Sequence, residues 1–208
     1  MLNSFIAIVA VIVSYLLGSI SFSILFARWL RKIDIRDHGS GNAGATNTLR
    51  VLGKGPAIAV FLLDIAKGSV AVGLGIWLGD GNDWISVACG LAAIGGHNWP
   101  IYFRFKGGKG IATTIGALIV WAFLPTLIAG IVAILVIVFT RYVSLGSMIF
   151  AVWLPILFYV FDLDAAYIWG ALVVAVLAIV RHRKNIVKLL NGTENKLGSS
   201  KKGEPHGA

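Results

Sequence analysis

The stretch Phe103–Gly110 (Phe-Arg-Phe-Lys-Gly-Gly-Lys-Gly) combines cationic side chains with glycines between two apolar segments. Its backbone N–H groups are free to face an anion, and it leads into an apolar, helix-like run that starts at Ile111. We therefore predict that residues 106–110, the glycine turn, bind phosphate through Lys106, Lys109 and the glycine amides. The turn is not a Walker A loop, because that motif requires Ser or Thr directly after its lysine and this chain has Gly110 there.

A second polar segment, residues 39–50, alternates small residues with neutral hydrogen-bond donors and ends at Arg50. Its glycines allow the backbone to approach a ligand closely, and a guanidinium can hold a phosphate through two parallel hydrogen bonds. The alternative is a flexible linker, but a linker has no use for Asn, Thr and Arg at this density. The residues that we expect to contact substrate here are Ser40, Gly41, Asn42, Gly44, Ala45, Thr46, Asn47 and Arg50.

Further polar groups flank the later apolar runs. His97 precedes the glycine turn, although a histidine in this setting is more often a hydrogen-bonded structural residue than a ligand. Ser144 and Ser147 share a helix face, so one can donate to a ligand while the other bonds back to a helix carbonyl. His182 and Asn185 also share a face, and Glu194 is a rare acid in a basic region.

Asp64 and Lys67 lie three residues apart within an apolar run and therefore share one helix face. We predict that they form an ion pair, because an unpaired charge inside a membrane is costly. The pair either belongs to the functional site or fixes its helix to a neighbouring loop, and we assign both residues to support of the site.

The elements that must position these groups are membrane helices. Of the 208 residues, 58% are hydrophobic and only 13% are charged, compared with about 25% in soluble domains. Apolar runs cover residues 5–27, 56–79, 85–103, 111–124, 125–140, 144–161 and 164–180, and most approach the roughly 17–25 residues of a spanning helix. We therefore predict an all-α integral membrane protein with about seven transmembrane helices.

The distribution of charge predicts the orientation of these helices. With seven spans and the N-terminus outside, the basic loops all fall on the cytoplasmic side, as does the C-terminus. If residues 111–140 formed one span kinked at Pro125, six spans would result and the basic loops would be divided between both sides. We therefore favour seven spans, which places on the outer side Asp80, Asp83, Asp162 and Asp164.

A single helical domain is predicted over residues 1–197. The first apolar run lacks a basic leader and is longer than the apolar core of a signal peptide, so we expect an uncleaved anchor. Residues 198–208 have no apolar periodicity, which predicts a disordered tail or a cloning remnant. The single cysteine, Cys89, excludes an internal disulfide, and its apolar setting indicates a buried, inert thiol.

The net charge of +9 does not by itself indicate nucleic-acid binding. The basic residues flank apolar runs, where topology and anionic lipid head groups account for them, so we expect no nucleic-acid partner. The acids near these segments, Asp34, Asp37 and Glu194, make a weak cluster among cations that already neutralise phosphate. We therefore expect no metal and no cofactor.

In chain order, three of these segments resemble the motifs of the bacterial acyl-phosphate:glycerol-3-phosphate acyltransferase family. They are residues 39–47 with Arg50, then residues 96–100 with 106–113, and finally His182-x-x-Asn185 with residues 192–194. The resemblance spans nearly the whole chain. Trp99 stands where the family more often has Phe, a difference that puts nothing important in doubt.

This resemblance implies acyl transfer from acyl phosphate to the 1-hydroxyl of glycerol 3-phosphate, which gives lysophosphatidic acid and phosphate in the first step of bacterial phospholipid synthesis. It also implies a site at the cytoplasmic face of the inner membrane, among membrane lipid, and we expect a monomer. The catalytic candidates are His182, Ser147, Lys109, Arg50 and Asn185. The remaining candidates for substrate binding are Lys67, His97, Lys106, Gly107, Gly108, Gly110, Thr113 and Glu194.

An acyl phosphate carries a good leaving group, so we predict direct attack without an acyl-enzyme. The chain has no His-x4-Asp signature and no serine that obviously pairs with a histidine–acid dyad. The base is either His182 or an oxygen of the substrate phosphate, and we favour the latter. Two other classes compete with an enzyme: an organic-phosphate transporter, which would place its site near the bilayer midplane between repeats, and a non-catalytic scaffold.

Overall fold

The computed structural model describes residues 2–198, and this part of the chain is helical with no strand, which confirms the all-α class. The tail predicted over residues 198–208 lies, except for Gly198, outside the described residues. The α-helices are α1 (Leu2–Gly18), α2 (Phe22–Arg31), α3 (Ala45–Leu52), α4 (Lys54–Leu78), α5 (Asp83–Asn98), α6 (Ile111–Trp121), α7 (Phe123–Thr140), α8 (Val143–Val160), α9 (Ala165–Arg181) and α10 (Arg183–Leu190). Two 3-10 helices are η1 (Ile35–Asp37) and η2 (Ile101–Phe103).

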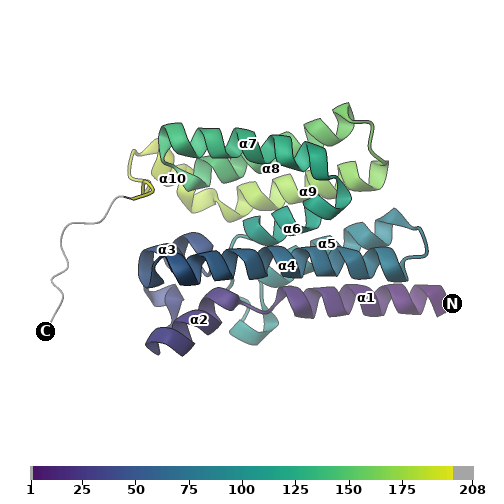
Figure 1. Ribbon diagram of the computed structural model, residues 1–208, viewed down its shortest axis with the longest axis horizontal. Coiled ribbons are helices and arrows are strands. Elements are labelled where there is room, and N and C mark those ends of the chain that lie inside the picture. The colour runs from purple at the N-terminus through teal and green to yellow at the C-terminus, as the bar shows by residue number, and fades with distance from the viewer. Residues whose placement is uncertain (1, 199–208) are drawn as a thin grey trace, which may run out of the picture.

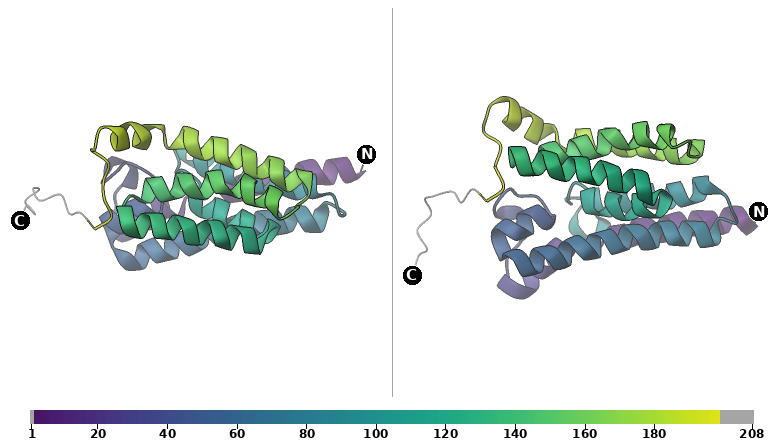
Figure 2. Two further views of the ribbon diagram at one scale, coloured as in Figure 1. Left: turned by 90° about the horizontal axis from the view of Figure 1, so that it is seen from above. Right: turned by 45° about the horizontal axis from the view of Figure 1, so that its top comes forward.

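The longer helices lie side by side along one axis of the molecule (Figure 1). The N-terminus, the α4–α5 turn and the α8–α9 turn lie at one end, while α2, α3 and α10 lie at the other (Figures 1 and 2). The acidic turns and the basic polar segments are therefore at opposite ends of the bundle, as the charge pattern requires.

The seven predicted apolar runs correspond to seven helices, namely α1 and α4 to α9, but not all of these are long enough to span a bilayer. Within the described residues, four segments are long and apolar enough to cross a membrane: residues 4–31, α4, α7 and α8. The bent pair α9 and α10, which meet at 58°, makes a fifth if it is counted as one span. Helix α6 has 11 residues, about 16 Å, which is short of the roughly 30 Å hydrocarbon core.

Three predicted boundaries differ from the structure for local reasons. The first run is interrupted after Gly18, and α2 begins only at Phe22. The run predicted over 85–103 ends as a helix at Asn98, close to Pro100, which lacks an amide donor. The break between α6 and α7 falls at Ala122 and not at Pro125. Pro125 lies in the first turn of α7, where its missing N–H removes no helical hydrogen bond, so it does not interrupt the helix.

Small residues allow the helices that carry the site to approach one another closely. A Cβ on Gly68 of α4 would overlap the backbone carbonyl of Thr113 in α6, and a Cβ on Gly96 of α5 would overlap that of Tyr15 in α1. The end of α5 and the start of α6, which bracket the glycine turn, are thus fixed against α1 and α4. The buried core lies beside them and includes Val87, Leu118, Trp121, Phe150, Leu154 and Phe158. Cys89 is free and buried, as predicted.

Candidate active site

The glycine turn is held by the end of α5 and by a side chain from α9. The amide of Gly108 donates to the carbonyl of His97 at 3.1 Å. Arg181 donates to the carbonyls of Gly108 at 2.5 Å and Gly107 at 3.3 Å, and its guanidinium lies 5.3 Å from the ring centroid of Trp99. The prediction that every amide of this turn contacts phosphate is therefore wrong for Gly108, whose N–H is used within the protein.

The glycines of this turn are required by close packing. A Cβ on Gly107 would overlap the carbonyl of His97, and a Cβ on Gly108 would overlap the ring of His97 and the carbonyl of Ala43. Gly110 has a φ of 80°, the left-handed region that favours glycine, at the residue that caps α6. Because these three positions have no side chain, the turn packs closely against the end of α5, and the side chain of Lys109 lines the pocket.

Replacing Gly108 with alanine is expected to destabilise the protein by about 1–3 kcal/mol, because the added methyl group has no space between His97 and Ala43. Thermal unfolding of the detergent-purified protein would measure this. The matched control is Gly95→Ala in α5, where a Cβ meets nothing within 4 Å and where alanine favours the helix. Equal unfolding temperatures for Gly108→Ala and the wild type would contradict the packing explanation.

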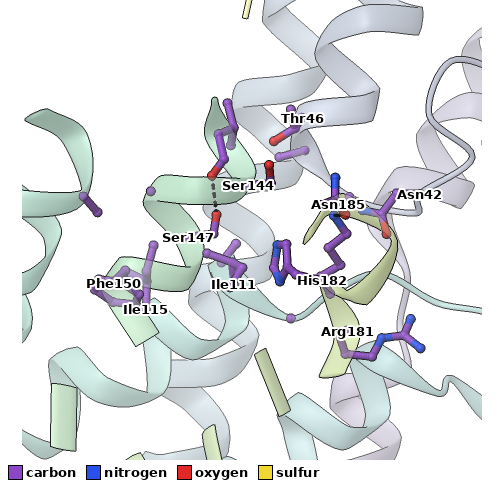
Figure 3. A pocket seen from close by; sticks show the side chains of 18 of the residues that line it. Asn42, Thr46, Ile111, Ile115, Ser144, Ser147, Phe150, Arg181, His182 and Asn185 are labelled. Carbon is purple, nitrogen blue, oxygen red and sulfur yellow. Dashed lines mark hydrogen bonds between the residues drawn. The ribbon is translucent and has the colours of Figure 1, made fainter. Parts of the chain in front are cut away.

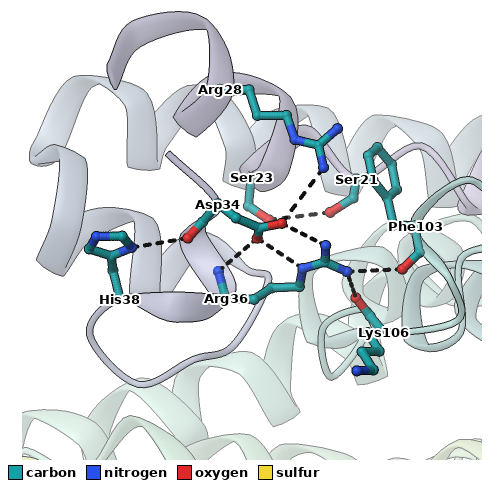
Figure 4. Close-up of polar contacts among 8 residues, drawn as sticks. All are labelled: Ser21, Ser23, Arg28, Asp34, Arg36, His38, Phe103 and Lys106. Atoms are coloured by element: carbon teal, nitrogen blue, oxygen red, sulfur yellow. Dashed lines mark hydrogen bonds and ion pairs between the residues drawn. The ribbon is translucent and has the colours of Figure 1, made fainter. Parts of the chain in front are cut away.

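The outer part of the same loop is fixed by an ion pair near η1 (Figure 4). Arg36 lies 2.6 Å from a carboxylate oxygen of Asp34 and donates to the carbonyls of Phe103 at 2.9 Å and Lys106 at 3.2 Å. The hydrogen bond from Arg36 lowers the pKa of Asp34 to about 2, so the pair is charged at neutral pH. Only the carbonyl of Lys106 takes part; its side chain is exposed and, contrary to prediction, does not line the site.

A chain of hydrogen bonds links the glycine turn to α10 and α8. Lys109 donates through Nζ to Oδ1 of Asn185 at 2.6 Å. Asn185 donates through Nδ2 to Oε1 of Glu194 at 2.7 Å, and the same oxygen accepts from the hydroxyl of Ser144 at 2.8 Å. Because the amide of Asn185 has one partner on each side, its orientation is fixed and its oxygen faces the ammonium group.

The two serines of α8 have different hydrogen-bond partners, and the structure shows which of them bonds back to its own helix. Ser147 donates to the carbonyl of Val143 at 2.9 Å, the dashed line in Figure 3, whereas Ser144 is the serine that contacts another polar side chain. Both line the pocket. His182 follows the last residue of α9, is 2% exposed, and its ring lies among the pocket side chains near Asn185 (Figure 3).

These groups surround one pocket with a volume of about 840 Å³. Its polar end is formed by Ser40, Gly41, Asn42, Gly44, Ala45, Thr46, Arg50, Lys109, Arg181, His182, Asn185 and Glu194. The pocket is also lined by His97, Gly107, Gly110, Ser147 and Asn47. The side chain of Asn47, however, makes three hydrogen bonds to the backbone of residues 35–40, so it holds this segment in place. Four of the predicted substrate-binding residues do not line the pocket: Lys67, Lys106, Gly108 and Thr113.

The pocket continues into an apolar wall that was not predicted from the sequence. It is formed by residues of α6, α7 and α8, with polar and apolar side chains on different sides (Figure 3). The wall includes Ile111, Ile115, Leu127, Ile131, Ile134 and Phe150. These residues were missed because nothing distinguishes them from other apolar residues of membrane helices. Arg181 was also missed as a site residue, although its position beside His182 was a signal.

The polar end carries a concentrated positive charge. Burial lowers the pKa of Lys109 to about 8; Glu194 acts in the opposite direction, while Arg50, Arg181 and Lys188 lower the pKa further. Burial also lowers the pKa of the Arg50 guanidinium, which Glu194 partly offsets. An arrangement with several cations and one carboxylate is suited to a ligand that carries more than one negative charge.

The pKa of Lys109 predicts the pH dependence of anion binding. Below about pH 8 its ammonium group is charged and attracts an anion, and above that pH the group becomes neutral and the attraction is lost. The affinity of the free protein for glycerol 3-phosphate should therefore fall as pH rises through about 8. Calorimetric titration across this range would measure it. In Lys109→Arg, which stays charged, this fall should be absent, and an unchanged fall would contradict the assignment.

The predicted ion pair between Asp64 and Lys67 is confirmed. Nζ of Lys67 lies 2.8 Å from Oδ1 of Asp64, and both side chains are 2% exposed. Lys67 also donates to the carbonyl of Ile20, in the break between α1 and α2, at 2.7 Å. The pair thus fixes α4 to a neighbouring loop, which is one of the two predicted roles, and Asp64 also lines the pocket described above.

The chain is similar to known proteins over most of its length. The family model for glycerol-3-phosphate acyltransferase matches residues 8–192. The chain is 57% identical over 196 residues to the glycerol-3-phosphate acyltransferase of Halalkalibacterium halodurans, covering 92% of this chain and 95% of the relative. It is 47% identical over 192 residues to that of Thermoanaerobacter sp., covering 92% and 96%.

Two solved structures of the integral membrane glycerol 3-phosphate acyltransferase PlsY are similar in fold. The glycerol 3-phosphate form has a TM-score of 0.87 and 38% identity, covering 92% of this chain and 96% of that chain. The lysophosphatidic acid form has a TM-score of 0.84 and 36% identity, covering 92% and 95%. With its pocket, its three motifs and these similarities, the chain belongs to the glycerol-3-phosphate acyltransferase family of membrane proteins.

Proposed function

We propose that this protein transfers an acyl chain from acyl phosphate to the 1-hydroxyl of sn-glycerol 3-phosphate, releasing lysophosphatidic acid and inorganic phosphate as the first step of bacterial phospholipid synthesis. The observation that carries the proposal is one pocket of about 840 Å³ in which a cationic polar end meets an apolar wall. A water-soluble phosphate and a phosphate with a lipid tail both fit such a pocket. The related PlsY structures, in glycerol 3-phosphate and lysophosphatidic acid forms, support it.

The proposed step is a direct attack. The C1 oxygen of glycerol 3-phosphate forms a bond to the carbonyl carbon of the acyl phosphate, the bond from that carbon to the phosphate oxygen breaks, and a base takes the hydroxyl proton. Lys109, held by Asn185, and Arg50 stabilise the negative charge on the phosphates and on the transition state. Enclosure in one pocket aligns the two substrates, which supplies much of the rate when the leaving group is good.

The hydrogen bond of His182 supports a role as the base. Its Nδ1 lies 2.8 Å from the carbonyl of Ala178, and a carbonyl can only accept, so the proton is on Nδ1. The other ring nitrogen, Nε2, then carries a lone pair in the neutral ring and is able to accept a proton. An oxygen of the substrate phosphate is the competing base. The tautomer leaves Nε2 able to act as the base, although burial lowers the pKa of His182 to about 4 and so weakens it, and the His182→Ala variant decides between the two.

No cofactor or metal is part of the proposed step. Within residues 2–198, no group of three or more His, Cys, Asp or Glu side chains is placed to hold a metal ion. We expect the acyl-transfer rate to be unchanged when the assay contains an excess of a strong chelator. A loss of activity that added Mg²⁺ restores would contradict this.

A reconstituted enzyme assay tests the function against its competitors. Purified protein in lipid vesicles is mixed with acyl phosphate and glycerol 3-phosphate, and release of phosphate and formation of lysophosphatidic acid are measured. A transporter would move labelled glycerol 3-phosphate across the vesicle wall without releasing phosphate, and a scaffold would do neither. Absence of phosphate release from folded protein would overturn the proposal.

The placement in the membrane is also proposed. We propose one domain over residues 1–197 with seven membrane helices, of which α6, with its 11 residues, does not cross the hydrocarbon core by itself. The N-terminus is outside, the C-terminus and the polar end of the pocket are cytoplasmic, and the protein is a monomer of the bacterial inner membrane. The segregation of acidic turns and basic segments at opposite ends supports this orientation (Figure 1). Labelling of single cysteines introduced at Asp80 and Lys188, in a Cys89→Ser background, tests it, since only the first should react from outside intact cells.

A further inference from the structure

A buried lysine contacts the histidine that precedes the glycine turn. Nζ of Lys67 lies 3.1 Å from Nδ1 of His97, in addition to its contacts with Asp64 at 2.8 Å and the carbonyl of Ile20 at 2.7 Å. None of the three side chains is more than 5% exposed. The ring of Phe22 closes another side, with its centroid 5.6 Å from the ammonium nitrogen.

This contact determines where the proton of His97 lies. Two groups face Nδ1 of His97: the ammonium of Lys67 at 3.1 Å and Oδ1 of Asp64 at the longer distance of 3.5 Å. Because the ammonium is nearer and has three N–H donors and no acceptor, we take Nδ1 as the acceptor of its hydrogen bond. The ring is then neutral, with its proton on Nε2. His182 is the opposite case, because its Nδ1 faces the carbonyl of Ala178 and must donate. The pocket is therefore lined by two histidines in opposite tautomers.

The other edge of the His97 ring faces the glycine turn. A Cβ on Gly108 would overlap Nε2, which places this nitrogen directly against the residue that precedes Lys109. His97 lines the pocket and, within residues 2–198, no side chain or backbone group accepts a hydrogen bond from Nε2. The ring therefore has one edge fixed by Lys67 and one N–H donor beside the polar end.

We propose that Lys67 is a positioning residue that holds His97 as the neutral Nε2–H tautomer, and that this N–H donates to an oxygen of the bound phosphate substrate beside Lys109. The site would then combine a neutral donor, His97, with a neutral acceptor, His182. A neutral donor adds a hydrogen bond without adding to the repulsion among Lys109, Arg50 and Arg181. The part that concerns substrate rests on the proposed function, whereas the tautomer does not.

Nitrogen-15 NMR of the intact protein in lipid bilayers tests the tautomer directly. With labelled histidine and lysine, the signal of His97 is identified by its through-space correlation to Nζ of Lys67. We expect protonation on Nε2 alone for His97 and on Nδ1 for His182, which serves as the internal comparison. A His97 ring protonated on Nδ1, or on both nitrogens, would overturn the proposal whatever the activity of the protein.

A double variant separates positioning from simple charge balance. Lys67→Met alone leaves the buried charge of Asp64 with only the ring of His97, 3.5 Å away, as a partner, which is destabilising and would draw a proton onto Nδ1. D64L/K67M removes both charges together and should keep the fold. In D64L/K67M the signal of His97 is identified instead by its loss when His97→Gln is added, and it should show that the ring is no longer held as Nε2–H alone. We expect KM for glycerol 3-phosphate or acyl phosphate to rise about 10- to 100-fold, the range for a hydrogen bond to a charged group.

Two outcomes of this experiment contradict the positioning role. The first is wild-type KM and kcat in D64L/K67M with a wild-type unfolding temperature, which would show that the ion pair serves packing alone. The second is an unchanged Nε2–H signal in the double variant. If the wild-type protein itself releases no phosphate, the proposed function fails, and the tautomer measurement still stands as a separate result.

Discussion

Replacing Lys109 with alanine is expected to lower kcat/KM for acyl transfer about 100- to 1,000-fold, the usual effect of removing one preorganised donor from a site of developing negative charge. Lys109 lines the pocket, and its ammonium nitrogen lies 2.6 Å from Asn185. Without it, the substrate phosphates lose the ammonium group that Asn185 holds in place, and the leaving phosphate is less stabilised. Steady-state kinetics with each substrate varied in turn would measure the loss.

The matched control for this variant is Lys106→Ala. Lys106 lies three residues earlier in the same loop, but its side chain is exposed and only its backbone carbonyl is bonded, to Arg36. We expect near wild-type kinetics, because an exposed side chain without a contact contributes little. Similar losses in both variants would indicate a general effect of loop charge and would contradict a specific role for Lys109.

Replacing His182 with alanine is expected to lower kcat about 10²- to 10⁴-fold, the range of a general base, with a smaller change in KM. The reason is the fixed tautomer, in which Ala178 takes the Nδ1 proton and Nε2 is left to accept the proton of the attacking hydroxyl. Rapid measurement of a single turnover would separate this chemical step from product release.

The control for this variant is His38→Ala. His38 is exposed, contacts the carbonyl of Asp34 through Nδ1, and does not line the pocket. Its replacement should leave kcat unchanged. If His182→Ala keeps more than about a tenth of wild-type kcat, His182 is not the base, and an oxygen of the substrate phosphate is the remaining candidate.

Much of the site could be predicted because its residues are chemically unusual for a membrane helix. Arg50, Lys109 and Asn185 stand in clusters of small and polar residues between apolar runs, and such clusters indicate a ligand site more strongly than single basic residues do. The same reasoning correctly predicted the ion pair between Asp64 and Lys67. It failed for Lys106 and Thr113, because residue type and spacing do not show whether a side chain faces a pocket or solvent.

Several helix boundaries could not be predicted from hydropathy. The run that ends near residue 103 looks continuous by hydropathy, yet α5 stops at Asn98 and the chain forms the loop that carries the glycine turn. The short α6 is also hidden in the sequence, because apolar composition measures burial or lipid contact and not the length of a helix.

The sequence by itself determined the all-helical membrane class, the separation of acidic turns from basic segments, and most of the polar side chains that line the pocket. These depend on composition, charge and residue chemistry, which are properties of the chain alone. Only the tertiary structure decided which groups meet. It showed that the amide of Gly108 donates to the carbonyl of His97 and that Asn185 links Lys109 to Glu194 by hydrogen bonds. It also showed that the polar end of the pocket is continuous with an apolar wall. Such contacts join segments far apart in the chain, and their geometry depends on close helix packing at glycines, which no local pattern records.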